Sequence, residues 1–286
     1  MWRKARLLLE MIKFEHSVFA LPIAVSSALY ATGGAVRWGP FAWVVAAMVS
    51  ARSAAMAFNR IADAALDAKN PRTKNRHLPA GTVRLREAWI FTLAMAGAFV
   101  FSAGMLNATC LACSPGVLVI LLGYSLTKRF TWLCHFVLGL SLGLAPLGAW
   151  IAIREEFDLF PILLSALVLT WVAGFDIIYA TLDEDFDRRE GLRSIPARFG
   201  TRAALIVSAA CHIVTAGLLV AIYFNNRLGP LYLAWSAIVA VILAWEHFLV
   251  TPGNLQKAGT ALFEGNALVS LGVMAALLLD LYNRGA

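Results

Sequence analysis

Long, continuous apolar segments alternate with short polar connections along most of this chain. A membrane-spanning helix needs about 20 consecutive, mostly apolar residues, whereas a membrane-spanning β-strand alternates apolar and polar residues over about ten positions. The segments here are continuously apolar, so the pattern favours helices. Nine of them are long enough to cross a bilayer, at residues 17–36, 40–58, 88–106, 108–126, 132–153, 159–180, 203–224, 229–250 and 261–282.

Composition excludes the main alternatives to a membrane protein. Of the 286 residues, 60% are hydrophobic and 14% are charged, whereas soluble domains average about 45–50% apolar and about 25% charged residues. Disordered chains combine low hydrophobicity with high charge, and the four cysteines do not make a disulfide scaffold. The sequence therefore predicts an all-α polytopic protein of the lipid bilayer, with residues 1–286 forming a single transmembrane domain.

The basic residues indicate how the chain is oriented in the bilayer. The N-terminus and the connections after the second, fourth, sixth and eighth segments carry 19 of the 24 Lys and Arg residues, and the opposite side carries four. Because cytoplasmic connections are enriched in Lys and Arg, we expect the N-terminus and the long polar loops to be cytoplasmic. The remaining base, Arg52, lies within the second segment. The net charge of +7 thus reflects membrane topology, and no nucleic-acid partner is expected.

A polar motif begins the first of two long, charged cytoplasmic connections, residues 59–87. It contains Asn59, Asp63 and Asp67, which share one helix face because positions i and i+4 are neighbours on a helix. Arg52 lies on the same face, seven residues before Asn59. A charge within a membrane segment costs roughly 2.5–3.5 kcal/mol on insertion scales, so Arg52 is expected to face a cavity or a partner.

The second charged connection, residues 181–202, repeats this pattern. Asp183 and Asp187 have the same spacing as the first two aspartates, and each lies 120 residues after its counterpart. With Asp176 they occupy positions i, i+7 and i+11, which predicts another single polar face. The chain therefore resembles two similar four-helix halves followed by a ninth helix. Duplicated halves often place a binding site at their interface.

Four carboxylates that converge at a membrane surface repel one another unless a cation lies between them. Ligand sets of oxygen alone favour Mg²⁺ over Zn²⁺, and Mg²⁺ held by few carboxylates takes phosphate oxygens among its other ligands. The bases near the motifs suit a diphosphate, and Arg52, Arg76 and Lys128 are the strongest candidates. A solvated helix end balanced by nearby bases is the alternative for one motif, but two matching copies favour a metal site.

A phosphate-binding site next to an apolar cavity predicts a polyisoprenyl diphosphate as the substrate. Mg²⁺ and the fixed cations would stabilise the leaving diphosphate. The candidates to stabilise the allylic carbocation are Phe58, Tyr124, Phe175 and Tyr179, with helix packing or interfacial anchoring as their alternative role. An electron-rich acceptor, most simply a phenol, then attacks the cation. Asp176 would orient this acceptor or take its proton, and helix capping or pairing with Arg52 is an equally good explanation.

Two other classes of protein also contain duplicated acids in a membrane bundle. A cation-coupled secondary transporter uses repeats, but it would place these acids near the midplane rather than at cytoplasmic helix ends. A membrane phosphohydrolase acting on lipid diphosphates would use the same Mg²⁺ site, and exclusion of water separates transfer from hydrolysis. Prenyl transfer explains most of the pattern and is the favoured interpretation.

The motifs together resemble those of the UbiA superfamily of intramembrane prenyltransferases, over essentially the whole chain. The resemblance rests on Asn59-x₃-Asp63-x₃-Asp67, Asp176-x₆-Asp183-x₃-Asp187, Arg76-x-x-Pro79-x-Gly81, Tyr124-x₃-Lys128, Ser194 and Gly200. It implies a nine-helix bundle with a central cavity capped by cytoplasmic loops, and Mg²⁺-dependent transfer of an isoprenyl chain to an acceptor. By the same resemblance, the implied metal–diphosphate ligands are Asp63, Asp67, Asp183 and Asp187, assisted by Asn59, and the implied diphosphate contacts are Arg52, Arg76, Tyr124 and Lys128.

Within the superfamily, segments 12–22 and 72–81 are similar to the bacterial 4-hydroxybenzoate polyprenyltransferase-like branch. This implies an inner-membrane enzyme of ubiquinone or menaquinone biosynthesis. The branch includes enzymes of the futalosine route to menaquinone, so 1,4-dihydroxy-6-naphthoate is the alternative acceptor. His77 departs from the branch, because many relatives have proline there. Lys13 and His16 are candidates to contact an acceptor carboxylate, with interfacial anchoring as the alternative.

Several small residues are expected to serve packing alone. Gly139 and Gly143 lie four residues apart in one segment, and small residues at this spacing let helices approach closely. The same role is expected for the glycine pair at 33–34. Cys134 and His135 are not expected to act as a nucleophile pair, because adjacent residues on a helix point about 100° apart.

Overall fold

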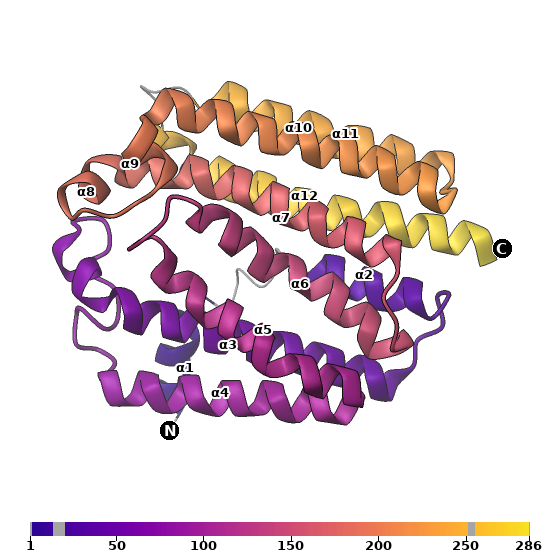
Figure 1. The fold of residues 1–286 in the computed structure, drawn as a ribbon, viewed down its shortest axis with the longest axis horizontal. Coiled ribbons are helices and arrows are strands. Elements are labelled where there is room, and N and C mark those ends of the chain that lie inside the picture. Colours follow the sequence, from indigo (N-terminus) through magenta and orange to yellow (C-terminus); the bar gives the residue numbers. More distant parts are fainter. Residues whose placement is uncertain (1, 14–20, 251–254, 286) are drawn as a thin grey trace. The chain divides into compact units, whose positions relative to one another are not determined.

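The computed structural model describes residues 2–13, 21–250 and 255–285 of the chain. These residues form helices joined by loops and contain no β-strand, in agreement with the all-α prediction (Figure 1). In chain order the elements are α1 (Trp2–Met11), α2 (Leu21–Ala31), α3 (Trp38–Lys69), α4 (Leu85–Leu106), α5 (Ala108–Thr127), α6 (Cys134–Arg154), α7 (Leu159–Ala180), the 3₁₀ helix η2 (Thr181–Asp183), α8 (Glu184–Arg189), α9 (Ile195–Phe199), α10 (Thr201–Asn226), α11 (Pro230–Leu249) and α12 (Leu255–Gly285).

Among the described residues, eight helices are long and apolar enough to cross a membrane. They correspond to the second to ninth predicted segments, and the chain is an integral membrane protein. Only Asn107 separates α4 from α5, and its Oδ1 accepts a hydrogen bond from the Cys110 N–H at 2.7 Å, which caps α5. The first predicted segment, 17–36, contains the 11-residue helix α2. Residues 17–20 of this segment lie outside the described chain. The count of nine spans therefore stays a prediction.

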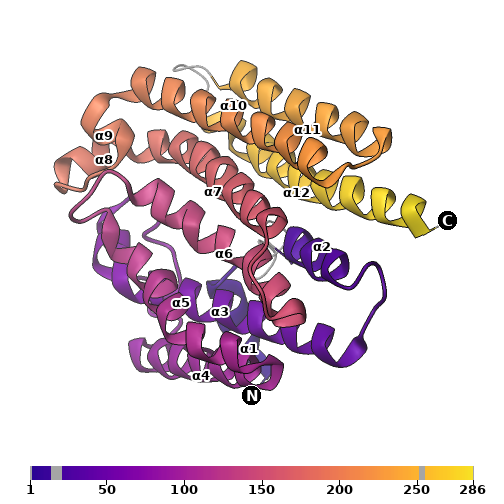
Figure 2. The ribbon, with the colours of Figure 1, turned by 45° about the vertical axis from the view of Figure 1, so that its right-hand side comes forward.

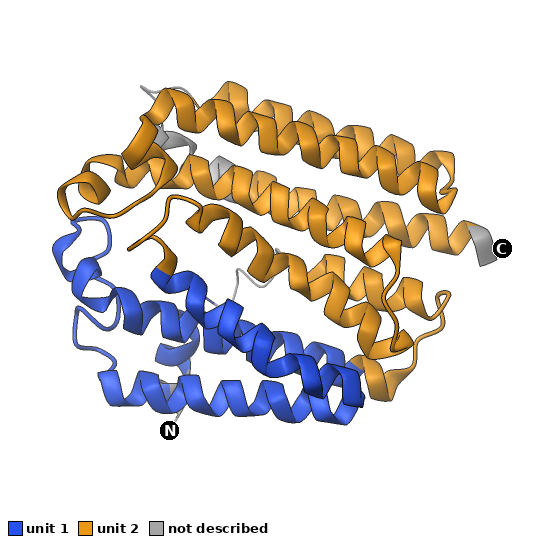
Figure 3. Cartoon of the chain, viewed as in Figure 1, with its two compact units in different colours: residues 1–17, 42–126 blue, residues 18–41, 127–286 orange. Residues whose placement is uncertain are grey.

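The chain divides into two compact units (Figure 3). Unit 1 comprises residues 1–17 and 42–126, and unit 2 comprises residues 18–41 and 127–286. This division differs from the predicted pair of consecutive four-helix halves. α2 belongs to unit 2, where it packs against α6 and α12, because Ile23 is part of the hydrophobic core of that unit.

In unit 1, α3 contacts each of the other helices. Ala57 of α3 clusters with Met11 of α1 and Ala88 of α4, and Ala51 of α3 clusters with Leu121 of α5. Small side chains let neighbouring helices approach closely, and edge-to-face aromatic contacts also join α3 to α4. These contacts hold α3 in place over the turns that precede the polar residues at its end.

In unit 2, α7 packs against both α6 and α10, while α11 packs against α10 and α12 (Figure 2). The core of this unit includes a chain of buried hydrogen bonds. Trp171 Nε1 donates to Asn266 Oδ1 at 2.6 Å, and Asn266 Nδ2 donates to Glu246 Oε1 at 2.8 Å. These bonds join α7, α12 and α11. Burying a polar group without a hydrogen-bond partner costs free energy, so the bonds favour this arrangement of the three helices.

Two glycines of α6 allow the close approach of α7, as predicted. A Cβ atom placed at Gly139 would lie 2.3 Å from the backbone oxygen of Leu169, and one placed at Gly143 would lie 2.7 Å from that of Ser165. The pair at 33–34 has another role. Its two residues follow α2 with φ angles of 65° and 93°, a backbone conformation that favours glycine in turns. A Cβ atom placed at Gly34 would also lie 3.4 Å from side-chain atoms of Leu281, so Gly34 combines the turn conformation with close packing.

Candidate active site

The first aspartate motif lies at the end of α3, which is one continuous α-helix of 32 residues. Asn59, Asp63 and Asp67 therefore follow one helix face, as predicted. Asp63 and Asp67 are each 6% exposed, and Asn59 Nδ2 donates a hydrogen bond to Asp63 Oδ2 at 3.3 Å. Removing a carboxylate from water is costly unless partners replace the water. Other side chains must therefore replace water as the partners of these two acids.

Arg76 supplies the counter-charge for Asp67. Its Nη1 lies 2.8 Å from Oδ1 and 2.9 Å from Oδ2 of Asp67. The turn that carries Arg76 is fastened to α3, because Thr73 Oγ1 donates to the backbone oxygen of Asp67 at 3.2 Å. Arg76 was predicted to contact a diphosphate, and the structure places it directly on a predicted metal ligand.

Further charged and polar side chains of unit 1 complete this cluster. Arg60 is 8% exposed and interacts electrostatically with Asp67 and Tyr124. Tyr124, on α5, interacts in the same way with Asp63 and Arg52. The predicted residues of unit 1 therefore lie in one charged cluster, which combines buried acids with arginines.

The second motif has a different backbone. α7 gives way to a 3₁₀ turn at Thr181–Asp183, and α8 begins at the next residue. A 3₁₀ turn advances about 120° per residue rather than about 100°, so three such residues rotate Asp187 by roughly 60° relative to Asp176. The helix that carries the three aspartates is therefore interrupted by a 3₁₀ turn, which the spacing alone did not predict.

Asp187 is 5% exposed, and a hydroxyl group holds it. Ser194 Oγ donates to Asp187 Oδ2 at 2.9 Å and accepts a hydrogen bond from the Ala197 N–H at 3.3 Å. The same hydroxyl therefore caps α9 and orients the carboxylate. Lys128 and Asp183 interact electrostatically with Asp187. This second cluster combines two acids with one of the predicted diphosphate-binding bases.

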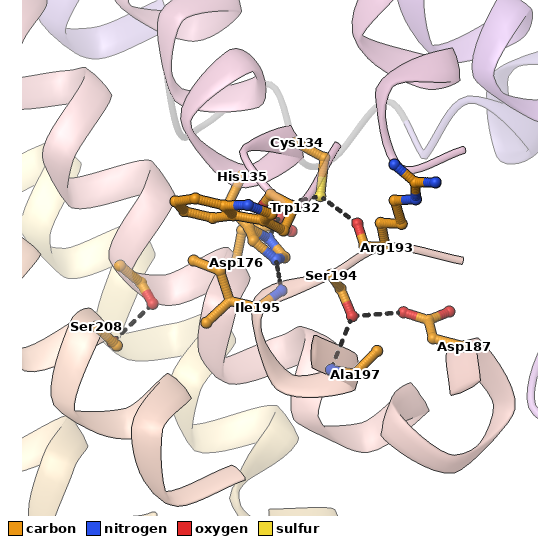
Figure 4. A network of polar contacts seen from close by, with 11 residues as sticks. Trp132, Cys134, His135, Asp176, Asp187, Arg193, Ser194, Ile195, Ala197 and Ser208 are labelled. Atoms are coloured by element: carbon orange, nitrogen blue, oxygen red, sulfur yellow. Dashed lines mark hydrogen bonds and ion pairs between the residues drawn. The ribbon is translucent and has the colours of Figure 1, made fainter. Parts of the chain in front are cut away.

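Asp176 lies within α7 and pairs with His135 at the start of α6 (Figure 4). His135 Nδ1 lies 2.7 Å from Asp176 Oδ2, and the Ile195 backbone N–H donates to His135 Nε2 at 3.3 Å. The imidazole is 3% exposed and the side chain of Asp176 is 32% exposed. Because Asp176 is not at a helix end, helix capping does not explain it.

The predicted site residues fall into one set per unit, and the contacts above bring the members of each set together. The joining of the two sets stays a prediction. Among the described residues, no three His, Cys, Asp or Glu side chains form a group arranged to hold a metal ion. Unit 1 contains Arg52, Asn59, Asp63, Asp67, Arg76 and Tyr124, and unit 2 contains Lys128, Asp176, Asp183 and Asp187.

The remaining candidates have local explanations or lie outside the described residues. The backbone oxygen of Lys13, two residues after the end of α1, lies 3.5 Å from Arg52 Nη2, so the turn after α1 contacts this partly exposed arginine. His77 Nε2 lies 3.8 Å from Glu10 Oε2, which gives this unusual histidine a partner on α1. His16 lies outside the described residues.

Sequence reasoning missed two members of these clusters. Arg60 carries the same signal that drew attention to Arg52, a charge within a largely apolar helix. It was counted only among the basic residues that indicate topology. His135 was considered only as a partner for Cys134. Its contact with Asp176 spans 41 positions, and no local spacing reports such a distance.

Comparison with known proteins agrees with these features. The UbiA prenyltransferase family matches residues 19–271. A 4-hydroxybenzoate octaprenyltransferase from Azotobacter vinelandii is 31% identical over 233 residues, which cover 80% of this chain and 77% of that protein. A UbiA homolog from Aeropyrum pernix K1 aligns with a TM-score of 0.84 at 36% identity, covering 93% of this chain and 98% of that one. A UbiA homolog from Archaeoglobus fulgidus bound to GPP and Mg²⁺ shares the fold, with a TM-score of 0.74 at 19% identity, covering 96% of this chain and 99% of that one.

Proposed function

The chain belongs to the UbiA prenyltransferase family, and from this we propose that it transfers a polyprenyl chain from a polyprenyl diphosphate to a hydroxylated aromatic acid. Family membership makes the protein a membrane-embedded prenyltransferase. The donor, the acceptor and the metal are what we propose in addition. We also propose that residues 1–286 act as one domain, with both aspartate motifs serving a single site.

The charge cluster at the end of α3 is the observation that carries this proposal. Asp67 is buried, and Arg76 contacts both of its oxygens, at 2.8 and 2.9 Å. A metal–diphosphate site needs acids for the metal and bases for the phosphates, and this cluster provides both. A passive helix end would leave such groups in water, whereas Asp67 and Arg60 are almost fully removed from it.

The donor chemistry of the motifs suits Mg²⁺. Mg²⁺ is usually held by one or two carboxylates, with waters and substrate phosphates completing its shell, so two acids in each unit meet the requirement. When bound, Mg²⁺ would stabilise the negative charge on the leaving diphosphate. Arg76 would then exchange Asp67 for a phosphate oxygen, and Arg52, Tyr124 and Lys128 would add contacts to the diphosphate. The metal ligands would be Asp63, Asp67, Asp183 and Asp187, with Asn59 assisting.

Asp176 is the residue that we assign to the acceptor. In the reaction, the C1–O bond of the prenyl diphosphate breaks, and its electron pair leaves with the diphosphate. The acceptor ring forms a C–C bond to C1 and loses one ring proton to the departing diphosphate. The Asp176 carboxylate would accept a hydrogen bond or a proton from the acceptor hydroxyl, which raises the electron density of the ring. Its 32% exposed side chain is accessible for such a contact.

The acceptor we favour is 4-hydroxybenzoate, because several relatives carry the name 4-hydroxybenzoate octaprenyltransferase. This choice places the enzyme in ubiquinone or menaquinone biosynthesis. The alternative, 1,4-dihydroxy-6-naphthoate, belongs to the futalosine route. We further propose a bacterial inner membrane, with the N-terminus and the site at the cytoplasmic surface, because most Lys and Arg residues lie on that side.

A turnover assay on the purified protein in detergent tests the proposal. The assay contains geranyl diphosphate and Mg²⁺, with 4-hydroxybenzoate or 1,4-dihydroxy-6-naphthoate in parallel reactions, and prenylated products are measured by mass spectrometry. We expect a prenylated aromatic acid that disappears with EDTA and with Asp67→Ala. The preferred acceptor, judged by kcat/KM, then decides between the two pathways.

Two outcomes would contradict the proposal. Release of diphosphate without a prenylated aromatic, in the presence of either acceptor, would favour hydrolysis. No consumption of geranyl diphosphate by folded protein would remove the proposed reaction and favour a transport function, which cation-dependent uptake by reconstituted vesicles would then measure.

A further inference from the structure

Both ring nitrogens of His135 have partners, and these partners fix their roles. Nε2 accepts a hydrogen bond from the Ile195 backbone N–H at 3.3 Å, so Nε2 carries no proton. The ring proton is therefore on Nδ1, which lies 2.7 Å from Asp176 Oδ2 and donates to it. The imidazole is 3% exposed, so water competes little for either bond. His135 is thus held as a neutral ring in one tautomer.

The backbone that binds His135 belongs to the loop of the second aspartate motif (Figure 4). Ser194, directly before Ile195, donates to Asp187 Oδ2 at 2.9 Å. Arg193, one residue earlier, donates its backbone N–H to the backbone oxygen of Lys128 at 2.7 Å. Three consecutive residues therefore make three different contacts. Arg193 bonds to the backbone of Lys128, Ser194 bonds to the proposed metal ligand Asp187, and Ile195 bonds to the imidazole of His135.

We propose that His135 is a positioning residue that couples Asp176 to the loop of the second aspartate motif. The inference rests on the proposed function, because it requires Asp176 to meet the acceptor. A fixed N–H donor on Oδ2 sets the orientation of the carboxylate, as a hydrogen-bonded third group orients the base in other active sites. When substrate binding displaces the Ile195 backbone, the rigid imidazole transmits that displacement to Asp176. Acceptor turnover then responds to occupation of the diphosphate site.

Two substitutions separate the two bonds of the ring. In His135→Asn, the side-chain amide N–H₂ is placed near the position of Nδ1, so the donor to Asp176 is kept and the acceptor for Ile195 is lost. In His135→Gln, the longer side chain places its oxygen near the position of Nε2, so the acceptor for Ile195 is kept and the donor to Asp176 is lost. A residue that merely fills space would give the same result with both.

The measured quantities are kcat and KM for the acceptor, together with direct binding of geranyl diphosphate in the presence of Mg²⁺. We expect His135→Gln to lower kcat by about 10- to 100-fold, the usual cost of losing an outer partner, with unchanged diphosphate binding. His135→Asn should keep a larger fraction of the wild-type kcat than His135→Gln does. It should also make the acceptor KM less dependent on whether the prenyl diphosphate is bound. In the Asp176→Asn background, His135→Gln should have no further effect on kcat.

Ser141 provides the matched control. It is a buried polar residue of α6, the helix that begins with Cys134 and His135, and its Oγ donates to the backbone oxygen of Val137 at 2.9 Å within that helix. Ser141→Ala should leave kcat unchanged. Equal losses of kcat with His135→Gln and His135→Asn, in proportion to a lower melting temperature, would show a structural role alone and overturn the inference. Additive effects of His135→Gln and Asp176→Asn would overturn it as well.

A second measurement keeps this inference separate from the proposed function. NMR of ¹⁵N-histidine-labelled protein reports the tautomer of each of the five histidines, and the signal absent in His135→Gln identifies His135. We expect the Nδ1–H tautomer, with a shift that changes in Asp176→Asn. An Nε2–H tautomer would overturn the coupling even in an active enzyme. The expected tautomer in a protein that prenylates neither acceptor would overturn the proposed function and leave only the structural contact.

Discussion

Asp67 in α3 and Asp187 in α8 are corresponding residues of the two motifs, but their partners differ in kind. The guanidinium of Arg76 holds Asp67, whereas the hydroxyl of Ser194 holds Asp187. Both acids are buried to nearly the same extent, at 6% and 5% exposure. The first motif therefore contains a charged partner in direct contact with the acid, whereas the second combines a neutral hydrogen bond with the longer-range charge of Lys128.

The backbones of the two motifs also differ, since one is a single long helix and the other is built from short elements. The first motif lies on a helix of 32 residues, which packs along its length in unit 1. The second lies on a 3₁₀ turn and two helices of six and five residues. Helices this short are not stable without tertiary contacts, so packing against neighbouring helices together with side-chain and backbone hydrogen bonds fixes the second motif. Two aspartate pairs with the same spacing in the sequence can therefore be held in place differently. A long helix holds the first pair, and contacts of short helices and a loop hold the second.

The largest expected effect tests whether the two motifs serve one site. Asp67→Asn and Asp187→Asn should each lower kcat by at least about 1,000-fold, because each removes one charge from the group that binds the metal and the diphosphate. Initial rates of prenylated product at saturating substrates measure this effect. Asp185→Asn is the control, because Asp185 is an exposed aspartate of the same short helix. An inactive Asp67→Asn beside an active Asp187→Asn would assign the chemistry to the first motif alone.

The contrast between the motifs also shows how far the sequence could predict the site. The i, i+4 spacing predicted the face of Asp63 and Asp67 correctly, because the apolar residues before them continue as one packed helix. The same spacing did not predict the 3₁₀ turn. There Thr181 Oγ1 donates to the backbone oxygen of Ile178 at 2.6 Å, and a local bond of this kind competes with regular helix geometry.

The partners of the acids were predictable to different degrees. Arg76 was predicted as a diphosphate contact from the basic stretch after the first motif, but its contact with Asp67, nine residues earlier, was not predicted. His135 was missed because its contact with Asp176 depends on how α6 packs against α7. At Gly139 the two helices lie so close together that no side chain would fit between them. Apolar periodicity predicts that such helices exist, but it does not give the rotation that brings one polar residue of each helix together.

An intermediate effect tests the charged partner of the first motif. Arg76→Gln removes the counter-charge of a buried carboxylate, so kcat/KM for the prenyl diphosphate should fall by about 100-fold. Arg76→Lys should recover part of the loss, because the ammonium restores the charge without the planar guanidinium geometry. Steady-state kinetics at several Mg²⁺ concentrations measure both. Lys74→Gln is the control, since it removes one exposed positive charge from the same loop. An equal loss with Lys74→Gln would indicate a general effect of loop charge rather than the contact with Asp67.

The smallest expected effects compare the neutral partners of the two motifs. Ser194→Ala removes both the hydrogen bond to Asp187 and the cap of α9, so activity should fall by about 10-fold and stability by about 1 kcal/mol. Asn59→Ala removes a hydrogen bond of 3.3 Å from an acid on a continuous helix, and a bond at this distance is weak, so activity should fall only by about threefold. Kinetics and thermal unfolding in detergent measure both variants. Ser208→Ala is the matched control, because Ser208 Oγ donates to the backbone oxygen of Gly174 at 2.7 Å and is buried away from Asp187, so it should lose stability without losing activity. If Asn59→Ala were more damaging than Ser194→Ala, the first motif would be the one that depends on a single side-chain bond, and the contrast between a rigid and a loop-supported motif would be reversed.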